Sequence, residues 1–339
     1  MERDELMWQG RSVFVTGATG LLGGWVVRRL LDVGADVTAL IRDHNPKSML
    51  VREGLINQVN GVYGSLEDAD LIKRSLAEYG VETVFHLAAQ PLVGVAKIDP
   101  VGTLRINVAG TWNVLEGART TKVKQVVVAS SDKAYGSSDR LPYKEDYPLQ
   151  GAYPYDASKS CTDIISNMYA TTYDMAVGVV RCANLFGGGD LNFSRTFPGV
   201  IKSTYYGQRF QIRSDGKFVR DFLYVKDAAE AYLLMAEAME KGLRPGAVNF
   251  SLESKLNVLE CVDMVLDLMD RRDLKPEILN QASAEIREQY LSCAKAASLL
   301  GWRPSSGMRD ALKETIAWYS KHFESLDREA HGIAAAAEV

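Results

Sequence analysis

One strand expected in this chain ends in a run of chemically versatile residues. Three valines, 126–128, predict a buried strand, and Ser131, Asp132 and Lys133 follow it almost directly. A hydroxyl, a carboxylate and an ammonium at one strand end can exchange protons with a substrate. The same residue types are also common at solvated strand ends, so the rest of the chain has to decide between chemistry and a simple turn.

Tyr155 and Lys159 form a second candidate group, because residues four apart lie on one face of a helix. A free phenol titrates near pH 10, and lowering its pKa by about three units takes roughly 4 kcal/mol of phenolate stabilisation. A nearby cation such as the Lys159 ammonium supplies part of it, and Tyr155 could then take a proton from a hydroxyl group. The spacing also occurs by chance, so the pair needs support from other motifs.

The elements that would position these groups follow an alternating pattern. From residue 12 to about residue 180, strand-length apolar runs alternate with helical stretches. This pattern predicts an α/β fold, a Rossmann-type doubly wound parallel sheet. We expect residues 1–180 to form an NAD-binding domain, 181–325 to form mainly a smaller α+β substrate-binding region, and 326–339 to form a tail.

Composition narrows the possible partners. The 339 residues carry a net charge of −4, which gives no general attraction for nucleic acid or anionic membranes. No apolar run reaches the roughly 18 residues of a membrane span, and the acidic start "MERDELMWQG" is unlike a secretory signal, so we expect a cytoplasmic protein. The cysteines lack C-x-x-C spacing and form no cluster with histidine, so we expect no metal and interpret them as reduced packing residues: Cys161, Cys182, Cys261 and Cys293.

A glycine motif lies where a dinucleotide would bind. Gly17, Gly20 and Gly23 follow the first expected strand and begin a helix. Glycines there let the backbone approach a pyrophosphate, and the helix N-terminus offers free N–H groups. The alternative is a tight turn that serves packing alone.

The second expected strand ends in Arg42 and Asp43. A carboxylate at this point binds the 2′-hydroxyl of NAD, whereas an arginine favours the 2′-phosphate of NADP. We favour NAD because Asp43 would oppose a phosphate, with Arg42 stacking on adenine, and NADP stays possible. Both residues would also suit a solvated turn.

Together these motifs resemble the extended short-chain dehydrogenase/reductase family, in its group of nucleotide-diphospho-sugar 4,6-dehydratases and epimerases. The resemblance covers nearly the whole chain. It runs through the glycine motif, "HLAAQPLV", Asn107, Ser131, Tyr155 and Lys159, "RCANLFGGGD", "RDFLYVKD" and "EQYLSCAKAASLLGWRP". In that family 4,6-dehydratases have an acidic residue and a proton-transfer residue after the catalytic hydroxyl, and the Ser-Asp-Lys version looks most like the CDP-glucose 4,6-dehydratases.

The resemblance implies site residues. Ser131, Asp132, Lys133, Tyr155 and Lys159 would be catalytic. Tyr155 would deprotonate the C4 hydroxyl, and Lys133 and Asp132 would serve as base and acid in the loss of water. The implied cofactor contacts are Gly17, Thr19, Gly20, Leu21, Leu22, Gly23, Arg42, Asp43, Ser65, Leu66, Leu87, Ala88, Ala89, Gln90, Asn107, Tyr155 and Lys159. The implied substrate contacts are Gln90, Ser131, Asn184, Arg195 and Arg220.

Departures from the family pattern leave the details open. Ser65 stands where the family usually has an aspartate near adenine, and "RDFLYV" follows the general family rather than the CDP-glucose group. The base of the substrate therefore stays undetermined. A sugar-nucleotide 4-epimerase, with Asp132 and Lys133 only shaping the pocket, is the main alternative, and a non-catalytic NAD-binding regulatory protein is a weaker one.

The resemblance also implies a homodimer. Family members usually pair through the helices that carry the Asn107 and Tyr155 segments. The second of these helices has apolar positions for such a contact, namely Ile164, Ile165 and Met168. These side chains would equally suit the core of their own chain.

Overall fold

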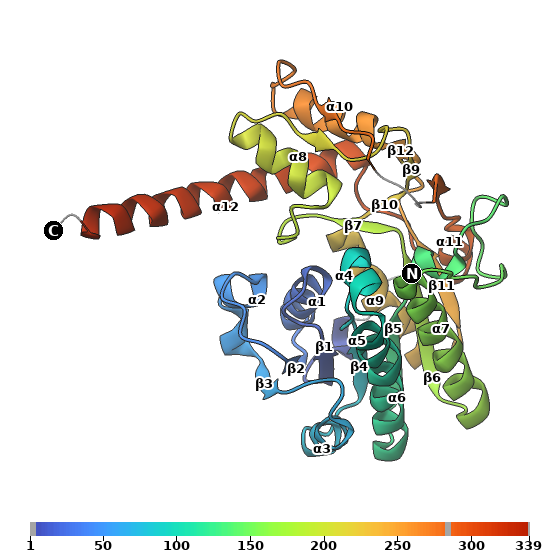
Figure 1. Ribbon diagram of the computed structural model, residues 1–339. Helices are drawn as coiled ribbons and strands as arrows, with labels where there is room; N and C mark the ends of the chain where they lie inside the picture. Colours follow the sequence, from blue (N-terminus) through green and yellow to red (C-terminus); the bar gives the residue numbers. More distant parts are fainter. Residues whose placement is uncertain (1–4, 282–285, 338–339) are drawn as a thin grey trace.

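The computed structural model describes residues 5–281 and 286–337 and is built around a seven-stranded parallel sheet (Figure 1). From edge to edge the sheet consists of β11 (Ala247–Phe250), β6 (Ala176–Cys182), β5 (Gln125–Ala129), β4 (Thr83–His86), β1 (Ser12–Thr16), β2 (Asp36–Ile41) and β3 (Asn60–Tyr63). The strand order reverses beside β1, and ligands of such sheets bind at the carboxyl ends of the strands near this point. The expected Rossmann-type sheet is confirmed.

Both faces of the sheet are buried. Val13 and Val15 of β1 belong to one apolar core, whereas Phe14 points into a second core on the opposite face. Alternation of this kind follows from the two-residue repeat of a strand. Strands buried on both sides explain why the sequence shows continuous apolar runs rather than alternating ones.

Helices form the layers on either side of the sheet. The first core includes residues of α1 (Leu21–Asp32) and α9 (Val225–Glu240), and the second includes residues of α3 (Ala69–Glu78), α6 (Gly110–Thr121) and α7 (Pro154–Tyr173). Asp68 caps α3 by accepting a hydrogen bond from the amide of Leu71 at 2.9 Å. A proline begins α7, where its missing N–H costs nothing.

Short elements connect these layers. They are η1 (Glu5–Met7), α2 (Met49–Arg52), η2 (Leu55–Gln58), α4 (Val93–Ile98), α5 (Pro100–Leu104), a π-helical turn η3 (Arg105–Ala109) and a 3₁₀ turn η4 (Asp132–Tyr135). Two of them carry predicted site residues, since η3 contains Asn107 and η4 begins at Asp132.

The chain after β6 forms most of a smaller region, drawn above the large sheet in Figure 1. Its helices are α8 (Thr196–Tyr205), α10 (Val258–Leu268) and α12 (Met308–Ala337), whereas α11 (Ala294–Leu300) packs against β11 and α9. Its strands pair as β7 (Asn184–Phe186) with β10 (Phe222–Tyr224), as β8 (Gln211–Ile212) with β13 (Glu277–Ile278), and as the three strands β12 (Leu256–Asn257), β9 (Val219–Arg220) and β14 (Glu288–Gln289).

Two elements of the expected substrate region belong to the large sheet instead. The last strand, β11, pairs in parallel with β6, and α9 packs beside α1 on the sheet. The chain therefore crosses to the smaller region after β6 and returns before β11. At its other end, α12 continues through much of the segment expected to be a tail. No helix of the described residues is long and apolar enough to cross a membrane.

Candidate active site

The glycine motif forms the turn between β1 and α1. Gly17 has a φ of +78°, and a Cβ on it would lie 2.8 Å from the amide nitrogen of Ala88. A Cβ on Gly23 would collide with the carbonyl oxygen of Gly17. Gly20 is the N-cap of α1 and has no side chain to cover the amides of the first turn. The turn therefore needs glycine and fits a pyrophosphate at the helix N-terminus.

The other cofactor candidates near this turn lie at its edges. Leu21 and Leu22 pack against the first core at the start of α1, and Thr19 is half-buried. Arg42 and Asp43 are exposed after β2 and form an ion pair with each other at 2.5 Å. Both are placed where a ribose-binding residue is expected, so the structure does not choose between them.

Ser65 and Leu66 follow β3. The side chain of Leu66 is buried in the second core, so only its backbone is free to face a ligand. The Ser65 hydroxyl accepts a hydrogen bond from the amide of Glu67 at 3.2 Å. The adenine contact predicted for this segment stays a prediction.

Asn107 holds the loop after β4. Its Oδ1 accepts from the amide of Gln90 at 2.7 Å, and its Nδ2 donates to the carbonyl of Gln90 at 3.1 Å and to Ser158 at 2.8 Å. The residue sits on a π-helical turn, a distortion often found at functional sites. Asn107 thus fixes the backbone of the segment Leu87–Gln90 and joins it to α7.

A buried histidine, which the sequence analysis did not single out, orders the same loop. Thr16 Oγ1 accepts from the amides of Leu87 and Ala88, both at 3.1 Å, so its proton is left for His86 Nδ1 at 2.9 Å. Nε2 of His86 then donates to Thr111 at 3.1 Å. Burial, together with the charge of Lys159, lowers the pKa of His86 to about 3, which keeps the ring neutral.

Ser131, Tyr155 and Lys159 meet at the carboxyl end of β5. Ser131 caps η4, and its hydroxyl lies close enough to Tyr155 to act to lower the pKa of the phenol, as the two residues approach from β5 and α7. Lys159 is 4% exposed and donates to the carbonyl of Ala129 at 2.8 Å. The structure therefore brings the two candidate groups of the sequence analysis into one site.

The electrostatics of this group differ in part from expectation. Burial, with a contribution from Asp132, raises the pKa of Tyr155 to about 12, against the opposing effects of Arg195 and Ser131. Burial lowers the pKa of Lys159 to about 8, opposed by the negative charge of Asp163. One N–H of Lys159 is directed at the carbonyl of Ala129 rather than at Tyr155. The expected lowering of the pKa of Tyr155 is therefore not produced by the protein chain alone.

Asp132 and Lys133 lie beside this group. Asp132 is 2% exposed, and its Oδ1 accepts from the Ser131 hydroxyl at 3.0 Å. The ammonium nitrogen of Lys133 lies 3.7 Å from Oδ2 of Asp132 and also donates to Gln289. Within the described part of the chain, Oδ2 accepts no hydrogen bond. A buried carboxyl oxygen and an amine are thus adjacent to the Ser131 hydroxyl.

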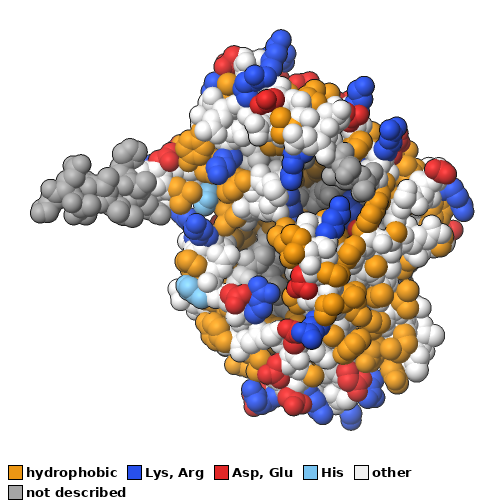
Figure 2. All heavy atoms as spheres, viewed as in Figure 1, with side chains coloured by type: hydrophobic (Ala, Val, Ile, Leu, Met, Phe, Trp, Pro, Cys, Tyr) orange, Lys and Arg blue, Asp and Glu red, His pale blue; other side chains and the backbone are white. Residues whose placement is uncertain are grey.

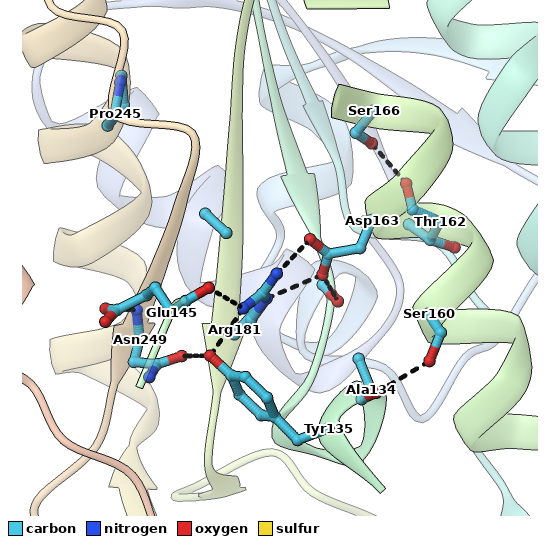
Figure 3. A network of polar contacts seen from close by, with 12 residues as sticks. Ala134, Tyr135, Glu145, Ser160, Thr162, Asp163, Ser166, Arg181, Pro245 and Asn249 are labelled. Carbon is cyan, nitrogen blue, oxygen red and sulfur yellow. Dashed lines mark hydrogen bonds and ion pairs between the residues drawn. The ribbon is translucent and has the colours of Figure 1, made fainter. Parts of the chain in front are cut away.

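A buried network supports the loop from behind (Figure 3). Arg181 of β6 pairs with Asp163 of α7 at 2.8 and 3.0 Å and donates to the hydroxyl of Tyr135 on η4 at 2.7 Å. Asp163 also accepts from Ser130 at 2.6 Å, and Tyr135 donates to Asn249 of β11 at 2.7 Å. One feature of the sequence could have pointed to this network, a charged residue, Arg181, near the end of the fully buried strand β6.

The substrate candidates lie around the same region. Asn184 donates to the carbonyl of Asp221 at 3.0 Å, and Arg195 pairs with Asp190 at 3.0 Å while staying 38% exposed. Arg220 lies on β9, in register with Gln289 of β14. Figure 2 shows Lys and Arg side chains beside a hollow between the upper and lower parts of the molecule. Among the described residues, no group of histidine, cysteine and carboxylate side chains could hold a metal ion.

Comparisons with known proteins find relatives that match nearly the whole chain. CDP-glucose 4,6-dehydratase of Salmonella typhimurium is 28% identical over 93% of this chain and 92% of its own length. The crystal structure of UDP-glucose 4-epimerase from Thermotoga maritima with UDP-glucose has a TM-score of 0.85 at 26% identity, covering 92% of this chain and 99% of that one. DesIV, a dTDP-glucose 4,6-dehydratase from Streptomyces venezuelae with NAD and TYD bound, has a TM-score of 0.83 at 26% identity, covering 91% and 97%.

The relatives include both dehydratases and epimerases, and their similarity extends over nearly the whole chain. The sequence profile described as the NAD dependent epimerase/dehydratase family matches residues 13–251. That range runs from the glycine turn through Lys159 to β11, and so includes every part of the candidate site except Gln289. This chain belongs to the NAD-dependent epimerase/dehydratase family.

Proposed function

We propose that this protein is a nucleotide-diphospho-hexose 4,6-dehydratase that converts CDP-glucose to CDP-4-keto-6-deoxyglucose. One observation carries the choice of dehydratase. Asp132, buried, and Lys133, 3.7 Å from it, directly follow Ser131, whose hydroxyl lies beside Tyr155. Loss of water needs a base and an acid in addition to the oxidising group, and this pair supplies both types.

NAD would lie along the carboxyl ends of β1, β4 and β5. The glycine turn fits its pyrophosphate, because Cβ atoms at Gly17 and Gly23 would collide with the backbone that forms the turn, and Gly20 leaves the N-terminus of α1 uncovered by a side chain. Asp43 would bind the ribose, and Lys159 would donate to the ribose next to the nicotinamide. When bound, NAD supplies hydride chemistry, taking a hydride from the sugar and giving it back. Titration calorimetry with NAD and NADP tests the choice of Asp43, since tighter binding of NADP would assign the ribose pocket to Arg42.

Tyr155 would remove the proton of the C4 hydroxyl, with Ser131 sharing that hydrogen bond. A pKa of about 12 makes the phenol a poor base in the protein alone, so extra positive charge must come close to its oxygen. Lys159, one helical turn away on α7, is the buried cation of the site, and it keeps its proton below about pH 8. Its ammonium would stabilise the phenolate and orient the ribose.

Lys133 and Asp132 would carry out the elimination. A C4 ketone acidifies the proton on C5, and the Lys133 amine would take that proton. The C5 electrons form the C5–C6 double bond as the C6–O bond breaks, and Asp132 would protonate the departing hydroxyl to give water. Asp132 therefore has to enter this step protonated.

Arginines would bind the diphosphate of the substrate. A guanidinium offers two parallel donors to phosphate oxygens, and both Arg195 and Arg220 are near the site. The charge of Arg195 lowers the pKa of Tyr155, and the charge of Arg220 lowers the pKa of Tyr143, against burial, which raises both. Asn184 and Gln90 are the proposed neutral contacts to the sugar nucleotide.

The competing activity is that of a nucleotide-sugar 4-epimerase, in which the 4-keto sugar rotates within the pocket before the hydride returns to C4. It is supported by the likeness to the Thermotoga maritima epimerase. Incubation with CDP-, UDP-, GDP- and TDP-hexoses, followed by mass spectrometry, separates the two. We expect a product lighter by one water from CDP-glucose. A product of unchanged mass and altered stereochemistry would establish the epimerase instead.

We also propose that the protein is a homodimer, because it carries a large exposed apolar surface (Figure 2). This surface is formed by side chains of α4 to α7, among them Ile98, Val101, Trp112, Ile164 and Met168, each at least 41% exposed. Exposed apolar patches of this kind are typical of interfaces. The sequence analysis offered Ile164, Ile165 and Met168 for this contact. Ile165 is not part of the proposed interface, since it packs against the second core of its own chain.

A further inference from the structure

Gln289, in the C-terminal part of the chain, contacts both Asp132 and Lys133, the pair proposed to eliminate water. It lies on β14 and is 0% exposed, and its position in the sequence is 156 residues beyond that of Lys133. Its Nε2 donates to the backbone carbonyl of Asp132 at 3.1 Å, and its Oε1 accepts from the ammonium of Lys133. One amide side chain therefore spans both members of the pair.

Chemistry fixes the orientation of this amide. A backbone carbonyl only accepts hydrogen bonds, and an ammonium only donates them, so Nε2 must face Asp132 and Oε1 must face Lys133. The opposite orientation would place two donors together and two acceptors together. A neutral amine still has N–H groups, so Lys133 can keep its bond to Oε1 after losing a proton.

The charge of the partner matters as much as its shape. Two carboxylates from different elements already face Lys133. Asp132 on η4 lies 3.7 Å away. Asp156 on α7 is the other: burial raises its pKa, and the charge of Lys133 acts to lower it. Arg220 on β9 contributes the opposite charge from across the β9–β14 pair. A third negative charge would favour the ammonium form of Lys133. Glutamine adds a hydrogen-bond acceptor without adding that charge.

We propose that Gln289 is a positioning residue that aims the Lys133 amine at the substrate while leaving it able to exist without its proton. The inference rests on the proposed function, in which Lys133 is the base at C5. It assigns a role in the chemistry to a segment outside the range matched by the family profile. Glutamine satisfies both contacts, whereas glutamate loses the donor and methionine loses both hydrogen bonds at similar volume.

The first test measures the charge state of Lys133 without using activity. The intact protein is labelled with trace acetic anhydride across a pH series, and acetylation of Lys133 is measured by mass spectrometry. In Gln289→Glu the midpoint of labelling should move to higher pH by about one unit, a tenfold change in proton affinity. An unchanged midpoint would overturn the role given to the neutral amide. Lys144, which is exposed, serves as the internal reference.

The second test follows a single turnover with the substrate that the hexose panel identifies. Gln289→Glu should slow dehydration by about tenfold near neutral pH and recover as pH rises, whereas Gln289→Met should slow it at every pH. The first hydride transfer, which does not use Lys133, should stay within about twofold and shows that the variants are folded. Wild-type dehydration in both variants would overturn the inference.

The variant Lys133→Met separates this failure from failure of the proposed elimination step. If Lys133→Met dehydrates normally, the protein is a dehydratase but Lys133 is not its base, and the role given to Gln289 is wrong with it. If the wild type itself releases no water from any hexose of the panel, the proposed function is wrong. If Lys133→Met fails to dehydrate while both Gln289 variants behave as wild type, only the positioning role is wrong.

Discussion

The two halves of the candidate site are held by different lengths of chain. Ser131, Tyr155 and Lys159 are fixed by β5 and α7, both within the first 180 residues. Lys133 follows the same strand, yet its ammonium is bound by Gln289 near the other end of the chain. The half proposed to oxidise the sugar is therefore built into the sheet domain, whereas the half proposed to eliminate water also depends on the smaller region. Relatives that are dehydratases and epimerases would share the first half and differ in the second.

The largest expected effect comes from the first half. Tyr155→Phe removes the base for the C4 hydroxyl, so both oxidation and the elimination that depends on it should fall by roughly 10²- to 10⁴-fold. Stopped-flow absorbance should show no reduced cofactor on addition of substrate. Tyr153→Phe, which removes a hydroxyl two residues away, is the matched control and should behave as wild type. Normal turnover of Tyr155→Phe would remove this residue from the mechanism.

A change in the second half should divide the two steps. Lys133→Met keeps Tyr155 and Lys159 in place, so C4 should still be oxidised while the C5 proton stays on the sugar. Reduced cofactor should accumulate, and water loss should slow by about 10²- to 10⁴-fold. Lys144→Met is the control on an exposed lysine of the following loop. If the wild type itself only interconverts C4 epimers, Asp132 and Lys133 only form the wall of the pocket. The site then has no eliminating half.

The pH dependence of the first hydride transfer should report on the first half alone. Burial lowers the pKa of Lys159 from 10.5 to about 8, so its ammonium is present below pH 8 and is lost as pH rises through that value. The rate of the first hydride transfer should therefore fall severalfold above pH 8. Lys159→Arg keeps its charge at high pH, so its lower rate should show no such fall. An alkaline decline that persists in Lys159→Arg would assign the titration to another group.

The smallest effect on chemistry is expected at the apolar surface. Ile164 is 60% exposed on α7, on a helix whose other side carries Tyr155 and Lys159 to the site. Ile164→Glu should shift the protein from dimer to monomer in sedimentation at micromolar concentration while changing turnover only a few-fold. Ile165→Glu, which places a charge against the core, should instead lower stability. A wild type that sediments as a monomer would contradict the dimer.

Local patterns in the sequence predicted the sheet, the glycine turn and the Tyr155–Lys159 pair, because each depends on residues within one turn or one strand. The features that were missed all depend on distant residues. Gln289 reaches Lys133 across the fold, and Arg181 meets Asp163 only when β6 lies beside α7. His86 could be placed in its strand, but its neutral state follows from burial and from the charge of Lys159. Spacing along the chain does not encode such contacts.

The return of the chain to the large sheet limits how the protein can be divided. β6 is covered at its edge by β11, and Arg181 of β6 is linked to Asn249 of β11 through Tyr135. A fragment ending at residue 180 would leave β6 as a long apolar edge with unpaired backbone groups, which is the surface that promotes edge-to-edge aggregation. Exchange of the substrate region between relatives therefore has to keep α9 and β11 with the host sheet, with the cuts made on either side of them. A soluble hybrid made by cutting only at residue 180 would show that β6 tolerates an open edge.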